Sequence, residues 1–201
     1  EIDKPYLRHI LQRPIPVYSK CIQSTRPSIR LCQISAVTKH AHSLSVVETV
    51  NRMKNINDSI YILNEGVWWR NTKMSKKIEI NKLKELKNIR KGNNFFIWRE
   101  TLAQHFPTTD GRYGSWYSNA KTCSKIQISP PNHRNIIKKL NMSILHIWEE
   151  SVQAFDQHLA LKTPHVIKHG LDCTHFCAKS RIMDILTNKT INIINKITSN
   201  T

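Results

Sequence analysis

The sequence has few acidic residues, no long apolar run and no motif that reads DNA or RNA. Its 31 Lys and Arg residues outnumber 14 Asp and Glu residues, which gives a formal net charge of +17. This charge predicts attraction to polyanions, whether nucleic acid, acidic glycans or an anionic membrane face. The densest basic run, residues 73–91, includes Glu79 and Glu85 at helical spacing and fits a solvated helix face as well as a binding patch. We therefore expect no specific nucleic-acid partner.

No apolar run approaches the ~20 residues that a membrane-spanning helix needs. With 39% hydrophobic and 22% charged residues, the 201-residue chain has the composition of a globular protein and suffices for one domain with its own core. It lacks a signal peptide and begins at Glu1 without a Met. We expect a fragment or a processed product, with any targeting signal or membrane anchor upstream.

The five cysteines are an odd number, which leaves room for a disulfide partner outside this sequence. Three glycosylation sequons begin at Asn57, Asn141 and Asn188. They are compatible with a protein of the secretory pathway.

Strand and helix patterns alternate along the chain, which predicts an α/β layered domain. Expected strands cover residues 28–35, 59–63, 94–98 and 143–148, and expected helices cover 43–55, 78–89, 132–140 and a closing segment after Cys177. The apolar run 59–63 suits a strand buried on both faces. Residues 149–170 are expected to be a loop. Four of the eight prolines lie in residues 1–30, which we expect to be an irregular lead-in before a domain spanning 31–201.

Polar side chains follow two of the expected strands. Asn64 comes directly after the strand 59–63 and can present its amide to an oxyanion, or it can belong to a simple turn before Trp68 and Trp69. Arg99, after the strand 94–98, can pair with a carboxylate of an acidic ligand, and His105 can contact a sugar hydroxyl. A structural role is the alternative for each of them.

A carboxylate, an imidazole and two thiols lie close together between residues 171 and 177. In a helical or turn-like backbone, Asp172 and His175 emerge on one side, so the carboxylate can orient the imidazole and leave its other nitrogen free to accept a proton. That pair makes two thirds of a catalytic triad. The alternative is a disulfide-held turn in which Asp172 caps the following helix.

Three blocks of the sequence, in this order, resemble one protein family. Residues 58–69 look like the strand-Asn-x-Gly-x-Trp-Trp block of the PC-esterase superfamily, which includes the trichome-birefringence-like polysaccharide O-acetyltransferases. Residues 96–106, with the downstream Trp116 and Cys123, look like its Arg-Thr-x-x-x-x-His-Phe block. Residues 172–177 are similar to its Asp-Cys-x-His-Trp-Cys signature. The resemblance extends from about residue 60 to the end of the chain.

The resemblance implies a three-layer SGNH-type α/β/α sandwich with a mostly parallel sheet, whose N-terminal part is incomplete here. It implies a cofactor-free Ser-His-Asp triad that moves acyl groups, acetyl above all, between an activated donor and carbohydrate hydroxyls in the Golgi lumen or outside the cell. Asp172 and His175 would be the acid and the base, and Asn64 an oxyanion donor. Substrate-binding candidates are Trp68, Trp69, Arg99 and His105.

The family pattern also implies that Cys173 pairs with Cys123, and that Cys177 pairs with Cys21 or with a cysteine outside the sequence. The Gly-Asp-Ser motif that carries the family's nucleophile is missing from this sequence. We expect the serine upstream and little activity from this chain alone. Val67 replaces the usual His before Trp-Trp, and Ala178-Lys179 replaces the usual Pro-Gly after the last cysteine, so plant-type acceptor specificity is not expected.

Two other kinds of site remain open. A non-catalytic protein of the same fold could hold an acidic glycan with Trp68, Trp69, Trp116 and a basic surface. A zinc site could be built from Cys123, Cys173, His175 and Cys177, although alternate-residue ligands on one strand fit the usual spacing poorly, and we expect no metal.

Overall fold

A computed structural model describes ten stretches of the chain. They are residues 20–23, 30–33, 46–53, 59–64, 84–85, 94–108, 111, 122–126, 134–158 and 172–199. The chain divides into two compact units. Unit 1 comprises residues 1–59 and 71–95, and unit 2 comprises residues 60–70 and 96–201.

Unit 1 contains a two-stranded ribbon and a helix. Strand β1 (Lys20–Gln23) pairs antiparallel with β2 (Arg30–Gln33), and Cys21 lies opposite Cys32 in the register. Helix α2 (Val46–Met53) confirms the helix expected in residues 43–55. Strand β2 likewise confirms the strand expected in residues 28–35, whereas β1 lies within the segment that we expected to be irregular.

Unit 2 is built on a parallel three-stranded sheet with the order β3-β4-β5. The strands are β3 (Ile60–Leu63), β4 (Phe95–Arg99, whose first residue belongs to unit 1) and β5 (Ser143–Leu145). The central strand β4 buries three consecutive residues, as a strand covered on both faces does. Together with its helices, this sheet confirms the α/β class predicted from the sequence.

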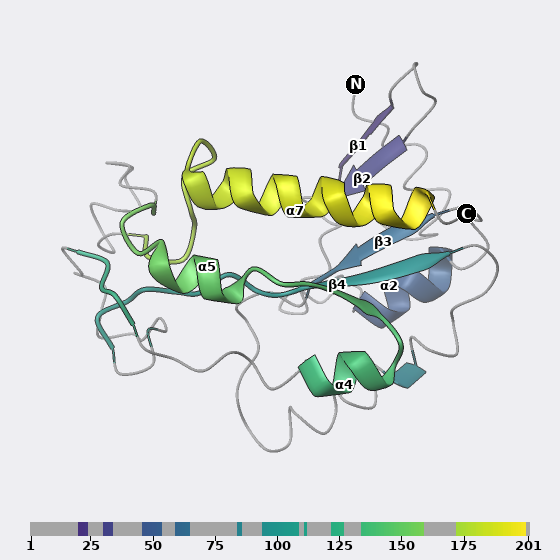
Figure 1. The fold of residues 1–201 in the computed structure, drawn as a ribbon, viewed down its shortest axis with the longest axis horizontal. Helices are drawn as coiled ribbons and strands as arrows, with labels where there is room; N and C mark the ends of the chain where they lie inside the picture. The colour runs from purple at the N-terminus through teal and green to yellow at the C-terminus, as the bar shows by residue number, and fades with distance from the viewer. Residues whose placement is uncertain are drawn as a thin grey trace. The chain divides into compact units, whose positions relative to one another are not determined.

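Among the described residues of unit 2, three helices accompany the sheet: α4 (Arg134–Lys139), α5 (Trp148–Gln153) and α7 (Arg181–Thr198). In Figure 1, α7 and α4 lie on opposite sides of the strands of unit 2. The 18-residue α7 is the expected closing helix. Its Ile182 is buried in one cluster with Ile147, Ala154 and Phe176, so the start of α7 packs on both ends of α5 and on the loop that leads into α7. Within the described ranges, no helix has the length and apolar character needed to cross a membrane.

Three expectations about the secondary structure need correction or lie outside the described residues. Strand β3 is not buried on both faces, because Tyr61 and Leu63 on one face are buried whereas Ile62 on the other face is 39% exposed. The expected strand 143–148 ends at Leu145, and α5 begins at Trp148, the last residue of that expected strand, and continues into the expected loop 149–170. Of the expected helix 78–89, only residues 84–85 are described, and these two are helical.

Candidate functional site

The predicted contact between Asp172 and His175 is present. The Asp172 Oδ2 atom lies 2.6 Å from the His175 Nδ1 atom, on the loop that leads into α7. The Asp172 side chain is 25% exposed and the His175 side chain 71% exposed. Within the described part of the chain, the Nε2 atom of His175 makes no hydrogen bond. The pair therefore has one imidazole nitrogen held by the carboxylate and the other open to solvent.

The second carboxylate oxygen of Asp172 shapes the turn on which His175 sits. Its Oδ1 atom accepts hydrogen bonds from the backbone N–H of Thr174 (2.9 Å) and of His175 (3.0 Å). Asp172 does not cap the following helix, because α7 begins after Ser180. One carboxylate thus fixes both the backbone and the ring of His175, as general-base catalysis requires.

Asp172 and His175 each stabilise the charged form of the other. Partial burial works to raise the pKa of Asp172, but hydrogen bonds from the His175 ring and from the N–H groups of His175 and Thr174 outweigh it and hold the pKa at about 2. The hydrogen bond to Asp172 raises the pKa of His175 above its usual 6.5, against partial burial. Asp172 is therefore an anion at neutral pH, and His175 is a stronger base than a free histidine.

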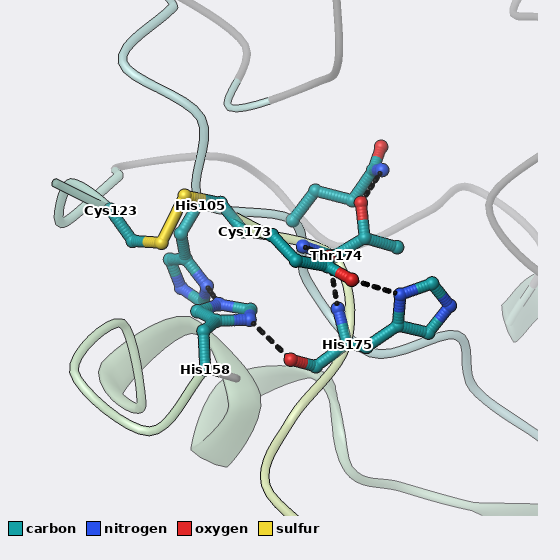
Figure 2. The surroundings of a disulfide bond; sticks show 8 residues. His105, Cys123, His158, Cys173, Thr174 and His175 are labelled. Atoms are coloured by element: carbon teal, nitrogen blue, oxygen red, sulfur yellow. Dashed lines mark hydrogen bonds and ion pairs between the residues drawn. A yellow bond between two sulfur atoms is a disulfide. The ribbon is translucent and has the colours of Figure 1, made fainter. Parts of the chain in front are cut away.

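A disulfide between Cys123 and Cys173 holds this loop, as the family resemblance implied (Figure 2). Cys173 is fully buried and directly follows Asp172. The backbone N–H of His105 donates to the Cys173 carbonyl at 2.9 Å, and Gln104 Nε2 donates to Thr174 Oγ1 at 2.8 Å. The segment after β4 therefore supports the loop from one side, and the disulfide supports it from another.

We expect that replacing both Cys123 and Cys173 with serine lowers the free energy of unfolding by ~4 kcal/mol. The disulfide closes a loop of 50 residues, and its loss returns that loop's conformational entropy to the unfolded chain. Denaturant unfolding under non-reducing conditions measures the change. Cys177→Ser is the matched control, because Cys177 is exposed and free, and it should change stability by less than about 0.5 kcal/mol. Equal losses in both variants would contradict the bracing role.

The finding that Cys177 is a free thiol corrects the expected pairing with Cys21. Its side chain is exposed on the turn before α7. A partner outside the sequence stays a prediction. The zinc alternative loses two of its four ligands, because Cys123 and Cys173 bond to each other. Among the described residues, no three His, Cys, Asp or Glu side chains are grouped to hold a metal ion.

His105 is an interior residue and not a contact for a sugar hydroxyl. Its side chain is fully buried, and both ring nitrogens have partners: Nε2 lies 3.1 Å from the Val152 carbonyl oxygen and Nδ1 lies 2.6 Å from His158 Nε2. A buried ring with both nitrogens engaged has nothing left to offer a substrate, so this candidate is wrong. His158, which the sequence placed only in a loop, is the residue that the structure adds here.

Asn64 and Arg99 lie next to each other at the carboxyl ends of β3 and β4. The Asn64 side-chain amide donates to the Arg99 carbonyl and to Thr101 Oγ1, both at 2.9 Å. Both of its amide hydrogens are therefore used in this conformation, and a role as oxyanion donor requires the release of one. That role stays a prediction. Trp68, Trp69 and Trp116 lie outside the described residues.

Glu100 is a structural centre that sequence reasoning missed. Its carboxylate is 5% exposed and accepts from Arg134 Nε (2.5 Å) and from the backbone N–H groups of Ile147 and Trp148 (3.0 Å each). Burial works to raise the pKa of Glu100, but these hydrogen bonds lower it to about 2. Glu100 thus joins β4 to the start of α5. Only its place directly after a buried strand could have indicated this.

The fold and the site define an α/β protein with a hydrogen-bonded carboxylate–imidazole pair on a disulfide-braced loop. No protein-family model matches the chain, and no curated protein or solved structure matches it. The interpretation of the site therefore depends on its geometry and on the three sequence blocks described above.

Proposed function

We propose that the chain is part of an SGNH-type O-acyltransferase or esterase, in which Asp172 and His175 activate a serine supplied by sequence outside residues 1–201. The observation that carries this proposal is the Asp172–His175 hydrogen bond with the Nε2 atom of His175 left open to solvent. A serine hydroxyl placed at Nε2 would lose its proton to His175 and attack an acyl donor. The bond between the acyl group and the donor's leaving group would break, and the leaving group would take the proton from His175. A glycan hydroxyl or water, deprotonated by His175, would then take the acyl group from the serine, which regains its proton.

The resemblance to the PC-esterase superfamily supports a three-layer α/β/α sandwich, a carbohydrate acceptor and a place in the secretory pathway. The parallel sheet of unit 2 and the helices α4 and α7 are compatible with such a sandwich. A disulfide is also typical of proteins that fold in an oxidising compartment.

An acyl-enzyme can be trapped to test the proposal. The full-length protein is incubated with an activated acetyl ester, quenched in acid and digested, and its peptides are analysed by mass spectrometry. We expect an acetylated serine in a Gly-Asp-Ser motif, absent from His175→Ala and present in His146→Ala. His146 is a suitable control because it is an exposed histidine of the same unit, outside the proposed site. A full-length protein without Gly-Asp-Ser, or acetylation that is unchanged in His175→Ala, would contradict the proposal.

Arg99 favours a second candidate, a non-catalytic protein that binds an acidic glycan. Its guanidinium group makes no hydrogen bond or ion pair with any residue in the described parts of the chain, and burial lowers its pKa. A largely buried cation without a partner is costly, and an anionic ligand would compensate it. Carboxylate or sulphate groups on a glycan have the required charge.

The two candidates differ in how glycan binding and acyl transfer respond to mutation. If the protein only binds glycans, binding to sulphated or uronic-acid glycans survives His175→Ala and weakens in Arg99→Gln, and no acyl-serine forms. If it is an enzyme, acyl-serine formation requires His175, whereas Arg99→Gln raises KM for acidic acceptors only.

A further inference from the structure

His105 and His158 form a buried imidazole pair beneath the loop that carries His175. Their facing nitrogens, His105 Nδ1 and His158 Nε2, are 2.6 Å apart. The rings meet edge to face, and His158 also stacks on Phe176 with ring centroids 4.2 Å apart. His105 is fully buried and His158 is 9% exposed, so bulk water does not hydrogen-bond to the two facing nitrogens.

The outer nitrogens of the pair both face backbone carbonyl oxygens. His105 Nε2 lies 3.1 Å from the Val152 oxygen. His158 Nδ1 lies 3.2 Å from the His175 oxygen (Figure 2). A carbonyl oxygen only accepts hydrogen bonds, so each outer nitrogen must carry a hydrogen. Two neutral imidazoles have two such hydrogens in total. Both are then used on the carbonyls, and the two inner nitrogens face each other with lone pairs only.

A third hydrogen removes this conflict. We propose that His105 and His158 share one additional proton between their inner nitrogens, and that the resulting chain from Val152 to the His175 carbonyl positions His175. The pair then makes three hydrogen bonds with three protons and carries a single positive charge. Such a charge-assisted bond between nitrogens is expected to be short, as this contact is.

The charges around the pair act in both directions. Burial lowers the pKa of each ring taken alone, and burial together with the neighbouring His105 lowers that of His158 to about 4, so two positive charges do not coexist on the pair near neutral pH. Asp156 favours a cation on His105, and Asp172 favours one on His158, whereas a protonated His175 opposes it. One proton spread over two rings is the state that meets both the hydrogen-bond geometry and these charges.

The link to His175 goes through the backbone. His158 pairs with Phe176 in an isolated antiparallel bridge, and Cys177 N–H donates to the Gln157 carbonyl at 2.9 Å. The His158 ring adds its hydrogen bond to the carbonyl of His175 itself. His175 is therefore held by Asp172 through its ring and by the imidazole pair through its backbone carbonyl. This positioning role rests on the proposed function, whereas the shared proton does not.

The pH dependence of stability tests the shared proton without any activity assay. With the proton shared, the pair binds a proton in the folded protein that two unfolded histidines release above pH 6.5. The inference therefore requires that the pKa of the pair as a whole is raised on folding, although burial lowers the pKa of each ring taken alone. Well below pH 6.5 the two unfolded histidines bind two protons and the folded pair binds one, so the stabilisation by the pair is largest near pH 6.5. It is lost as the pH rises from there through the folded pKa of the pair. We therefore expect the folding equilibrium constant of the full-length protein, relative to His105→Gln, to fall with rising pH by up to about tenfold per unit. A neutral buried pair gives no fall above pH 6.5 and a rise with pH below it, which would overturn the inference.

Nitrogen-detected NMR of the wild-type protein gives a second measurement if His105→Gln does not fold. We expect one strongly deshielded proton coupled to His105 Nδ1 or His158 Nε2. Two inner nitrogens that both show the shift of an unprotonated imidazole nitrogen at pH 6 would overturn the shared proton.

Two substitutions of His158 test the positioning role. Asn places an amide N–H near the position of imidazole Nδ1 and keeps the donor to the His175 carbonyl, whereas Gln places it near Nε2 and loses that donor. We expect His158→Gln to lower kcat for acyl transfer by up to about 10²-fold with KM unchanged, and His158→Asn to stay closer to wild type. Equal kcat values for the two variants would contradict positioning through this hydrogen bond, while an acyl-serine that still forms would leave the proposed function intact.

Discussion

Replacing His175 with alanine is expected to lower the rate of acyl transfer by the full-length protein about 10⁴-fold or more. His175 holds the Asp172 carboxylate on one nitrogen and has a side chain that is 71% exposed, so its removal takes away the proposed base. Single-turnover release of product from an activated acetyl ester measures the effect. The His146→Ala control should stay within about twofold to threefold of wild type, since surface substitutions away from a site have small effects.

The same pair predicts a pH profile. His175 must be neutral to accept a proton, and Asp172 raises its pKa above 6.5, so kcat/KM should rise with pH through a value above 6.5. Asp172→Asn removes the stabilisation of the imidazolium, and the rising limb should move to lower pH while the maximum rate falls. A limb that stays in place in Asp172→Asn would contradict the direct coupling of the two groups.

Replacing Glu100 with glutamine is expected to lower the free energy of unfolding by about 3 kcal/mol. Both carboxylate oxygens of Glu100 are surrounded by hydrogen-bond donors. Oε1 contacts Arg134 and His146, and Oε2 contacts Arg134 and the N–H groups of Ile147 and Trp148. Whichever oxygen becomes an NH2 group, it faces a donor. The buried N–H groups or the guanidinium then lose their acceptor.

Glu149→Gln is the matched control for Glu100→Gln. Glu149 binds the same Arg134 but is 55% exposed, and an exposed ion pair contributes only about 0–1 kcal/mol. Denaturant unfolding compares the two variants. The folded-state pKa of Glu100, about 2, lies below its ordinary 4.5, so its stabilisation is present above pH 4.5 and is lost as the pH falls from there toward 2. An equal effect of the two substitutions would contradict a central role for Glu100.

The sequence by itself determined the features that depend on neighbouring residues. Strands β3 and β4 and helix α7 follow from local patterns of apolar residues, and their alternation with other elements indicated the α/β class. The contact between Asp172 and His175 follows from a spacing of three residues within one turn. The pairing of Cys123 with Cys173 came from the family resemblance, because local spacing does not select a partner 50 residues away.

Only the tertiary structure decided which distant polar groups meet. His105 and His158 are 53 residues apart, and Glu100 and Arg134 are 34 residues apart. Neither pair has a local pattern, because each depends on the order of strands in the sheet and on where the following loops return to it. The sequence predicted that His105 contacts a substrate, whereas the structure buries it. Sequence alone could not show this, because burial depends on how several segments pack together. The sequence located the acid and base of the proposed site, and the tertiary structure revealed the groups that hold them.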